Sequence, residues 1–358
     1  MRLKTFRWVA VLALLVLAAA WQSRRLAAAR YSQQAGAYTA ATSKAPPALT
    51  FVVAGLGGFR GIAAEVLWFR AGRLQEEGRY MELVQLSDWI TMLDPHASEA
   101  WVYNAWNLAY NVSVMMNRPE DRLRWVENGV SLLRDEGLRF NPREARLYRE
   151  LAWFYQNKIG DVLDSAHLTY KLKLAETFAP NLNADGTVPT DAESRSRLTA
   201  QRLDPDRMAA LEKRFGPLDW RLPNTHALYW AAQGLELATG SERLLSSRAV
   251  YQPLILSVFN GRFTGDLAAR RWETAPNPAV ALPAADFLAA TQKEFPSRHM
   301  RNVYMNFLTT TIRGLAASEE NADFYVDRLF RQLVQELEPS ARNVTLDDIV
   351  KGWTPNET

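Results

Sequence analysis

A 34-residue register between residues 67 and 155 constrains the fold of this chain more than any other feature. Three apolar positions, large, small and large, recur 34 residues later: Leu67, Ala71 and Leu74 are followed by Trp101, Ala105 and Leu108. A period of this length is typical of a hairpin of two helices that cross at the small residue. Such hairpins bury their apolar faces by stacking, so the register predicts an all-α chain organised as a short α-solenoid.

Glycine and proline mark where the helices of this register end. Gly78 falls where the chain reverses between two helices, a position that favours φ > 0. Pro95 and Pro142 do not fit a helix interior and each precedes a new helix. These prolines are 47 residues apart, thirteen more than one period, so we expect longer helices around Met115–Pro119.

The same stretch resembles a known repeat family. Residues 76–86 resemble the turn and second helix of a tetratricopeptide repeat, and the pattern of its first helix recurs at Tyr148, Leu151, Ala152 and Tyr155. The resemblance covers residues from about 60 to 160 and implies a surface that binds other proteins. The whole chain is also similar to membrane-associated tetratricopeptide-like proteins of bacteria, a likeness that carries no activity. The alternative is a generic helical bundle whose apolar spacing coincides with the repeat.

The first thirty residues predict attachment to a membrane. Trp8–Trp21 is a hydrophobic run, and six basic and no acidic residues precede residue 31. We interpret residues 1–30 as an uncleaved single-pass anchor, with residues 8–21 in the bilayer. A signal peptide cleaved after Ala18–Ala20 is the alternative. Both place the remaining chain across a bacterial inner membrane, with the C-terminal domain in the periplasm.

The charge of the remaining chain argues against nucleic acid as a partner. After residue 30 the chain has 36 basic and 39 acidic residues. Nucleic-acid binders need a clear basic excess to neutralise phosphates, which this part of the chain lacks.

Composition divides the chain into six segments. We expect an anchor at 1–30, a small and polar spacer at 31–50, a tetratricopeptide-like domain at 51–180, a loop at 181–205, a second helical lobe with degenerate repeats at 206–340, and a tail at 341–358. In the second lobe, helices are predicted over 206–215, 300–317 and 321–338. Pro223 is followed by a small-residue crossing pattern, and residues 252–296 are broken up by prolines.

No motif predicts catalysis, a cofactor or a metal. The chain has no cysteine, and its four histidines (His96, His167, His226 and His299) lie too far apart to indicate a metal site. The glycine-rich run 53–61 has Arg60 where a dinucleotide fingerprint needs glycine. Asp161 and Asp164 are expected three apart on a solvated helix face, not as an acid–base pair.

Aromatic and basic residues on the predicted helices are candidates for a binding groove. Its candidate residues are Trp68, Trp106, Tyr110, Arg146, Arg149, Trp153, Gln156 and Asn157. Core packing of these aromatic residues is the alternative, and Trp101 is expected to pack between helices. The tetratricopeptide clamp for a peptide's terminal carboxylate uses lysine and asparagine; here its positions hold Trp68, Val102, Arg149, Gly72, Trp106 and Trp153.

The sequence therefore predicts a non-enzymatic scaffold or adaptor that binds protein partners in a bacterial envelope assembly. One alternative is an enzyme acting on cell wall or polysaccharide, or a sugar-binding protein, with tryptophans stacked on sugar rings. Another is a structural subunit of a membrane complex.

Overall fold

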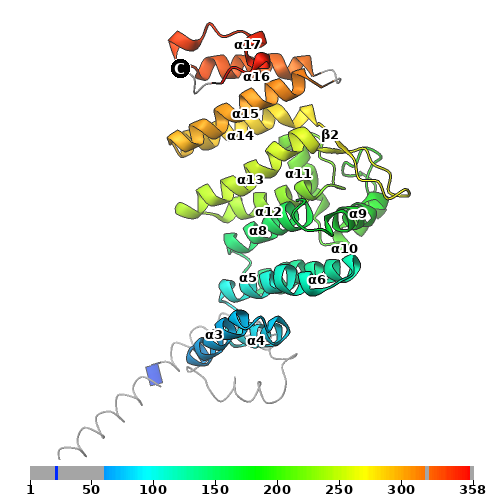
Figure 1. The fold of residues 1–358 in the computed structure, drawn as a ribbon, viewed down its shortest axis with the longest axis vertical. Helices are drawn as coiled ribbons and strands as arrows, with labels where there is room; N and C mark the ends of the chain where they lie inside the picture. The colour runs from blue at the N-terminus through cyan, green and yellow to red at the C-terminus, as the bar shows by residue number, and fades with distance from the viewer. Residues whose placement is uncertain (1–20, 23–59, 319–321, 355–358) are drawn as a thin grey trace, which may run out of the picture. The chain divides into compact units, whose positions relative to one another are not determined.

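A computed structural model describes residues 21–22, 60–318 and 322–354 (Figure 1). The described chain is predominantly helical, which confirms the predicted all-α class. Its one sheet in these ranges has two short antiparallel strands. The contacts divide the chain into two compact units, which are described separately: the first ends at residue 142 but leaves out 117–124, and the second holds 117–124 and everything from 143 onwards.

The first unit begins with the predicted helical hairpin. Helix α3 (Arg60–Glu76) packs against α4 (Tyr80–Leu93), which packs against α5 (Ser98–Trp106). Ala71 and Ala105, the small residues of the register, are fully buried. Gly78 ends the turn between α3 and α4 with φ of 69°, a conformation that costs glycine little. The predicted burial of both alanines and the predicted turn at Gly78 are thus confirmed.

The two predicted proline boundaries are joined by hydrogen bonds. The carbonyl oxygen of Pro95 accepts from Nε1 of Trp101 and from Nδ2 of Asn141, each at 2.9 Å. Trp101 also stacks on Phe140 with ring centroids 5.7 Å apart, and it is buried. The expectation that Trp101 packs between helices is therefore confirmed.

The extra residues of the middle hairpin lengthen its helices. Helix α5 continues into η2 (Asn107–Val112), a π-helical turn, and η3 (Ser113–Met115). The return run consists of α6 (Pro119–Ser131), a second π-helical turn η4 (Leu132–Gly137) and α7 (Leu138–Phe140). A π-helical turn accommodates inserted residues without ending the helix. The two runs approach closely, since a Cβ on Gly129 would lie 2.8 Å from the carbonyl oxygen of Ala105.

The second unit contains the remaining helices. They are α8 (Ala145–Trp153) with its π-helical continuation η5 (Phe154–Ile159), α9 (His167–Phe178), η6 (Ala179–Asn181), α10 (Ala192–Ala200), α11 (Pro205–Phe215), α12 (Pro223–Leu237), α13 (Ser241–Asn260), η7 (Pro278–Val280), α14 (Ala281–Glu294), α15 (Arg298–Ala316), α16 (Asp323–Glu336), η8 (Pro339–Ala341) and α17 (Leu346–Lys351). Strands β1 (Arg262–Phe263) and β2 (Thr274–Ala275) form a hairpin after α13. The helices predicted over 206–215, 300–317 and 321–338 are confirmed as α11, α15 and α16.

From α12 to α16, each helix of the second unit packs against the next one. Helix α12 packs along α8 and η5 on one side and against α13 on another. From there α13 contacts α14, α14 contacts α15, and α15 contacts α16, an order that Figure 1 shows within this unit. Because α8 packs along α12, the segments on both sides of the predicted loop 181–205 belong to one unit. The chain divides instead at residue 142, inside the predicted domain 51–180.

Two sequence predictions about the second unit are wrong. Helix α10 lies inside the predicted loop 181–205; it buries a single leucine, Leu198, and is capped by Asp191, so its hydrophobic period is weak. Asp161 and Asp164 do not lie on a helix, because η5 ends at Ile159 and residues 160–166 form bends and a turn.

The predicted anchor lies outside the described residues except for Trp21 and Gln22, as do the spacer 31–50 and residues 53–59 of the glycine-rich run. In the described ranges, no helix combines the length and the apolar character needed to cross a membrane.

Candidate functional site

Three residues of the predicted groove lie in the first unit, where aromatic rings pair on the hairpin helices. Trp68 meets Tyr103 edge to face, with centroids 5.0 Å apart, and Trp106 stacks on Tyr110 at 4.4 Å. All four rings are half-buried, and the Tyr103 hydroxyl donates to Oε1 of Gln75 at 2.6 Å. We call Trp68, Tyr103, Trp106 and Tyr110 the aromatic surface.

The other five predicted residues lie in the second unit. Arg146 and Arg149 are half-buried on α8, and Nη1 of Arg149 donates to Oε2 of Glu242 at 2.5 Å. Trp153, at the end of α8, is 44% exposed. The structure brings two of the five, Gln156 and Asn157, together with residues that are remote in sequence.

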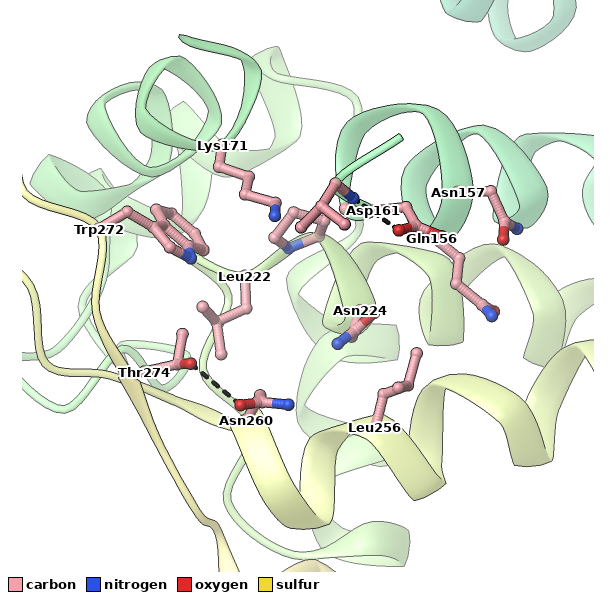
Figure 2. A pocket seen from close by; sticks show the side chains of 13 residues that line it. Gln156, Asn157, Asp161, Lys171, Leu222, Asn224, Leu256, Asn260, Trp272 and Thr274 are labelled. Atoms are coloured by element: carbon pink, nitrogen blue, oxygen red, sulfur yellow. Dashed lines mark hydrogen bonds between the residues drawn. The ribbon is translucent and has the colours of Figure 1, made fainter. Parts of the chain in front are cut away.

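Gln156 and Asn157 line a pocket of about 330 Å³ (Figure 2). Four side-chain amides face it, from three elements: Gln156, Asn157, Asn224 and Asn260. Other polar or aromatic residues of its wall are Asp161, Lys171, Trp272 and Thr274, while Leu222, Pro223, Leu256, Val162 and Gly160 complete the lining. We call this cavity the amide pocket. Its volume lies within the range of small-molecule sites.

A close approach between η5 and α12 shapes one side of the amide pocket. At Gly160, where η5 has ended, a Cβ would lie 3.1 Å from Cβ of Pro223 and 2.6 Å from the carbonyl oxygen of Gln156. Pro223 occupies the first turn of α12, where proline loses no intrahelical hydrogen bond. Glycine and proline at these positions let the loop after η5 lie against the start of α12.

The β-hairpin supplies the aromatic wall of the amide pocket. Trp272 packs on Phe263, with centroids 5.2 Å apart, and the backbone N–H of Phe263 donates to Oδ2 of buried Asp219 at 2.7 Å. Asp219 in turn accepts two hydrogen bonds from the guanidinium of Arg221, at 2.8 and 2.7 Å. Charge-assisted bonds of this bidentate kind are strong, so they fix the strand that carries Phe263. On the same hairpin, Oγ1 of Thr274 donates to Oδ1 of Asn260 at 3.2 Å.

Lys171, on α9, places an ammonium group at the amide pocket. Its side chain is 7% exposed, and Nζ lies 3.2 Å from Nδ1 of His167. Burial lowers the pKa of Lys171, and the negative charge of Asp161 offsets this only in part. Burial and the charge of Lys171 also lower the pKa of His167. Figure 2 shows Lys171 beside Trp272, with its amine directed toward the pocket.

A second buried lysine of this unit is fully paired. Nζ of Lys158, 4% exposed, donates to Oδ2 of Asp164 at 2.6 Å. Asp164 also accepts from the Tyr170 hydroxyl at 3.1 Å, from the Ala166 N–H at 2.9 Å and from Arg122 at 3.3 Å. Burial raises the pKa of Asp164, but these hydrogen bonds and the lysine charge outweigh it, so the pKa lies below its ordinary value. Asp164 is thus the centre of a closed ion-pair cluster and not a solvated surface carboxylate.

One histidine of the second unit is deeply buried. His226 has no exposed surface, and its Nε2 lies 2.9 Å from the carbonyl oxygen of Trp220. Burial lowers its pKa to about 4, so the ring is neutral and packs among Tyr155 and Phe178. In the described ranges, no cluster of three or more histidine or carboxylate residues has the arrangement of a metal site.

Sequence reasoning missed Lys171, Asn224, Asn260 and Trp272. Trp272 and Asn260 lie in the proline-interrupted stretch that the sequence left without an assigned structure, and Lys171 lies on a helix with no motif. The one sequence signal for this pocket was the prediction of Gln156 and Asn157 as groove residues, which lie on η5.

Comparison of the chain with models of protein families finds no matching family, and comparison with curated proteins finds no match either.

Proposed function

We propose that the chain is a tetratricopeptide-like α-solenoid, anchored by its first thirty residues, that acts as a scaffold or adaptor for protein partners in a bacterial envelope assembly. The observation that carries this proposal is the aromatic surface of the first unit. Rings at Trp68, Tyr103, Trp106 and Tyr110 gather on hairpin helices whose crossing points follow a 34-residue register.

Partly exposed aromatic pairs suit protein recognition because they bury a large area with few rotatable bonds. Tryptophan and tyrosine dominate the binding energy of many protein interfaces. The hydrogen bond from Tyr103 to Gln75 and the stacking of Trp106 on Tyr110 hold these rings in place before a partner arrives. Binding to such a surface loses little side-chain entropy.

Arginine contributes less to this proposal than the sequence suggests. Arg149 already has a carboxylate partner in Glu242, at 2.5 Å. An arginine held by its own chain must break or share that pair to bind another protein. The proposed docking residues are therefore the aromatic ones.

Crosslinking followed by affinity purification from native membranes tests the proposal. The variant is Trp106→Ala with Tyr110→Ala, and the control is Phe324→Ala, which removes a 60% exposed ring from α16. We expect the double variant to lose the co-purified proteins at least tenfold and the control to retain them, with helical circular dichroism unchanged in both. Equal recovery of the same proteins with the double variant would refute docking at the aromatic surface.

A further inference from the structure

The amide pocket holds a buried cation, the ammonium group of Lys171. Among the described residues no carboxylate oxygen lies within 4.0 Å of Lys171 Nζ, whose neighbour is the ring of His167. Asp161, on the same wall, is close enough to influence the pKa of Lys171, but its Oδ1 accepts from the N–H of Val162 at 2.6 Å. An ammonium group removed from water in this way is unfavourable unless an anion pairs with it.

A ligand with a carboxylate would complete this site. Its negative charge would pair with Lys171 as that of Asp164 pairs with Lys158. A phosphate or sulfate ester would need more positive charge than this wall offers. Among the described lining residues Lys171 is the one lysine or arginine, and Asp161 adds a negative charge. One positive charge beside amides suits a singly charged anion.

The amides indicate the rest of the ligand. Each amide carries two N–H donors and one oxygen acceptor, so it can bond to a hydroxyl in either sense. The side-chain amides of Gln156 and Asn224 make no hydrogen bond to any described residue, and Asn260 engages its oxygen with Thr274. Trp272 adds a flat apolar face beside Lys171 (Figure 2). Amide groups together with an aromatic wall match a ring with hydroxyls on its edge and C–H groups on its face.

We propose that the amide pocket binds a sugar acid, a pyranose unit whose carboxylate pairs with Nζ of Lys171. Its hydroxyls bond to the amides of Gln156, Asn224 and Asn260, and its C–H face lies on Trp272. This site is separate from the aromatic surface, and the proposal does not depend on the scaffold function. The unit can be a free uronic acid or one residue of an acidic polysaccharide, because both present the same carboxylate and hydroxyls.

The proposal is one of binding and not of cleavage. Glycoside hydrolysis uses two carboxyl groups on either side of the bond that breaks. Asp161 is the one carboxylate of the described wall, and Asp164 is held in its ion-pair cluster by Lys158, Tyr170 and Ala166.

Isothermal titration calorimetry on the full chain in detergent tests the proposal. The probes are glucuronate, galacturonate, an oligogalacturonate, glucose, acetate and a short glutamate-containing peptide. We expect a uronate or the oligogalacturonate to bind at least tenfold more tightly than glucose, acetate and the peptide. A free uronate that binds as well as the oligomer identifies the monosaccharide as the source; tight binding of the oligomer alone identifies the polymer.

Variants separate the contribution of Lys171 from a general effect of charge. Lys171→Met should weaken binding of the acidic sugar about 10- to 100-fold, the cost of one charge-assisted hydrogen bond. Lys173→Met is the matched control, because Lys173 lies on the same helix but is exposed, and it should leave the affinity unchanged. Trp272→Ala and Asn224→Ala should each weaken binding severalfold, and they serve as readouts if Lys171→Met does not fold.

Three results would overturn the proposal. The first is no heat of binding for any acidic sugar at millimolar concentration. The second is glucose or the glutamate peptide binding as tightly as the uronates, which would assign the pocket to neutral sugars or to protein. The third is equal affinity for the acidic sugar in the wild type and in folded Lys171→Met. None of these results bears on the aromatic surface, which is tested by recovery of protein partners.

Discussion

Lys158 and Lys171 lie in the same unit and are buried to nearly the same extent, 4% and 7% exposed, yet their surroundings differ completely. Lys158 pairs with Asp164, which also accepts from Tyr170 and Ala166, so every charge in that cluster has a partner. Lys171 has an imidazole neighbour and faces a cavity.

The difference separates a structural charge from one available to a ligand. A buried ion pair is expensive to disrupt, since removal of one partner strands the other in a medium of low polarity. A buried ammonium group with no anion beside it makes few stabilising interactions in the folded protein. Its replacement by an apolar side chain therefore removes a desolvation cost. Stability measurements on the two sites should therefore change in opposite directions.

The largest expected effect is that of Asp164→Asn. It removes the carboxylate that accepts from Nζ of Lys158 at 2.6 Å, and we expect the free energy of unfolding to fall by about 3 kcal/mol. Urea denaturation followed by circular dichroism measures it. Asp161→Asn, in the same turn segment but outside any ion pair in the described structure, is the control and should cost less than about 0.5 kcal/mol. Equal losses in the two variants would contradict the distinction.

The Asp164 effect should also depend on pH in a defined direction. The folded protein holds the pKa of Asp164 below its ordinary value of 3.8, so its contribution to stability is complete above pH 3.8. As the pH falls through the lowered folded pKa, protonation of the folded state removes that contribution. The difference in stability between the wild type and Asp164→Asn should therefore vanish in that acidic window. A difference that persists under strongly acidic conditions would mean that charge is not its cause.

A smaller loss is expected from Lys158→Met. Asp164 keeps its hydrogen bonds from Tyr170 and Ala166, and Arg122 lies 3.3 Å away, so its charge is not left alone. We expect the free energy of unfolding to fall by about 2 kcal/mol, less than for Asp164→Asn. The same urea titration measures it, with Lys173→Met as an exposed control on α9. A larger loss for Lys158→Met than for Asp164→Asn would show that Arg122 does not compensate.

Lys171→Met should have the opposite sign. Methionine fills nearly the same volume without a charge, so we expect the free energy of unfolding to rise by about 1 kcal/mol in the absence of ligand. Differential scanning calorimetry without ligand measures the change. A destabilisation of 2 kcal/mol or more would show that Lys171 has a structural partnership like that of Lys158.

The helical hairpin of the first unit shows what could be predicted from the sequence. The hairpin could be predicted because Ala71, Gly78 and Pro95 lie within one period and each has a local effect. Alanine lets two helices approach, glycine adopts a positive φ at the turn, and proline lacks the N–H that a helix interior needs. The all-α class and the helices of the second lobe followed from the same kind of local periodicity.

The amide pocket was not readable, because Lys171, Asn224 and Trp272 come from separate segments and meet through the packing of α9, α12 and the β-hairpin. Asp164 was misplaced on a helix, since nothing in the spacing revealed that η5 would end where Gly160 contacts Pro223. Whether a buried charge meets an opposite charge depends on residues that are distant in sequence, and the periodicity of apolar residues does not reveal it.

The smallest expected effect is the alkaline pH dependence of Lys171. Burial lowers the pKa of Lys171 below its ordinary value of 10.5, so between the folded and the unfolded pKa the unfolded chain binds more protons than the folded one. Stability from this group therefore rises with pH across that interval, as the folded protein is relieved of its buried charge. Two groups beside Lys171 bear on this interval: His167, whose lowered pKa leaves its ring neutral there, and Asp161, whose negative charge raises the pKa of Lys171. We expect the stability advantage of Lys171→Met over the wild type to shrink as the pH is raised toward 10.5, measured by urea denaturation at each pH.

An advantage that is constant with pH would show that Lys171 is destabilising through its shape and not through an unpaired charge, and it would remove the reason for an acidic ligand at this pocket.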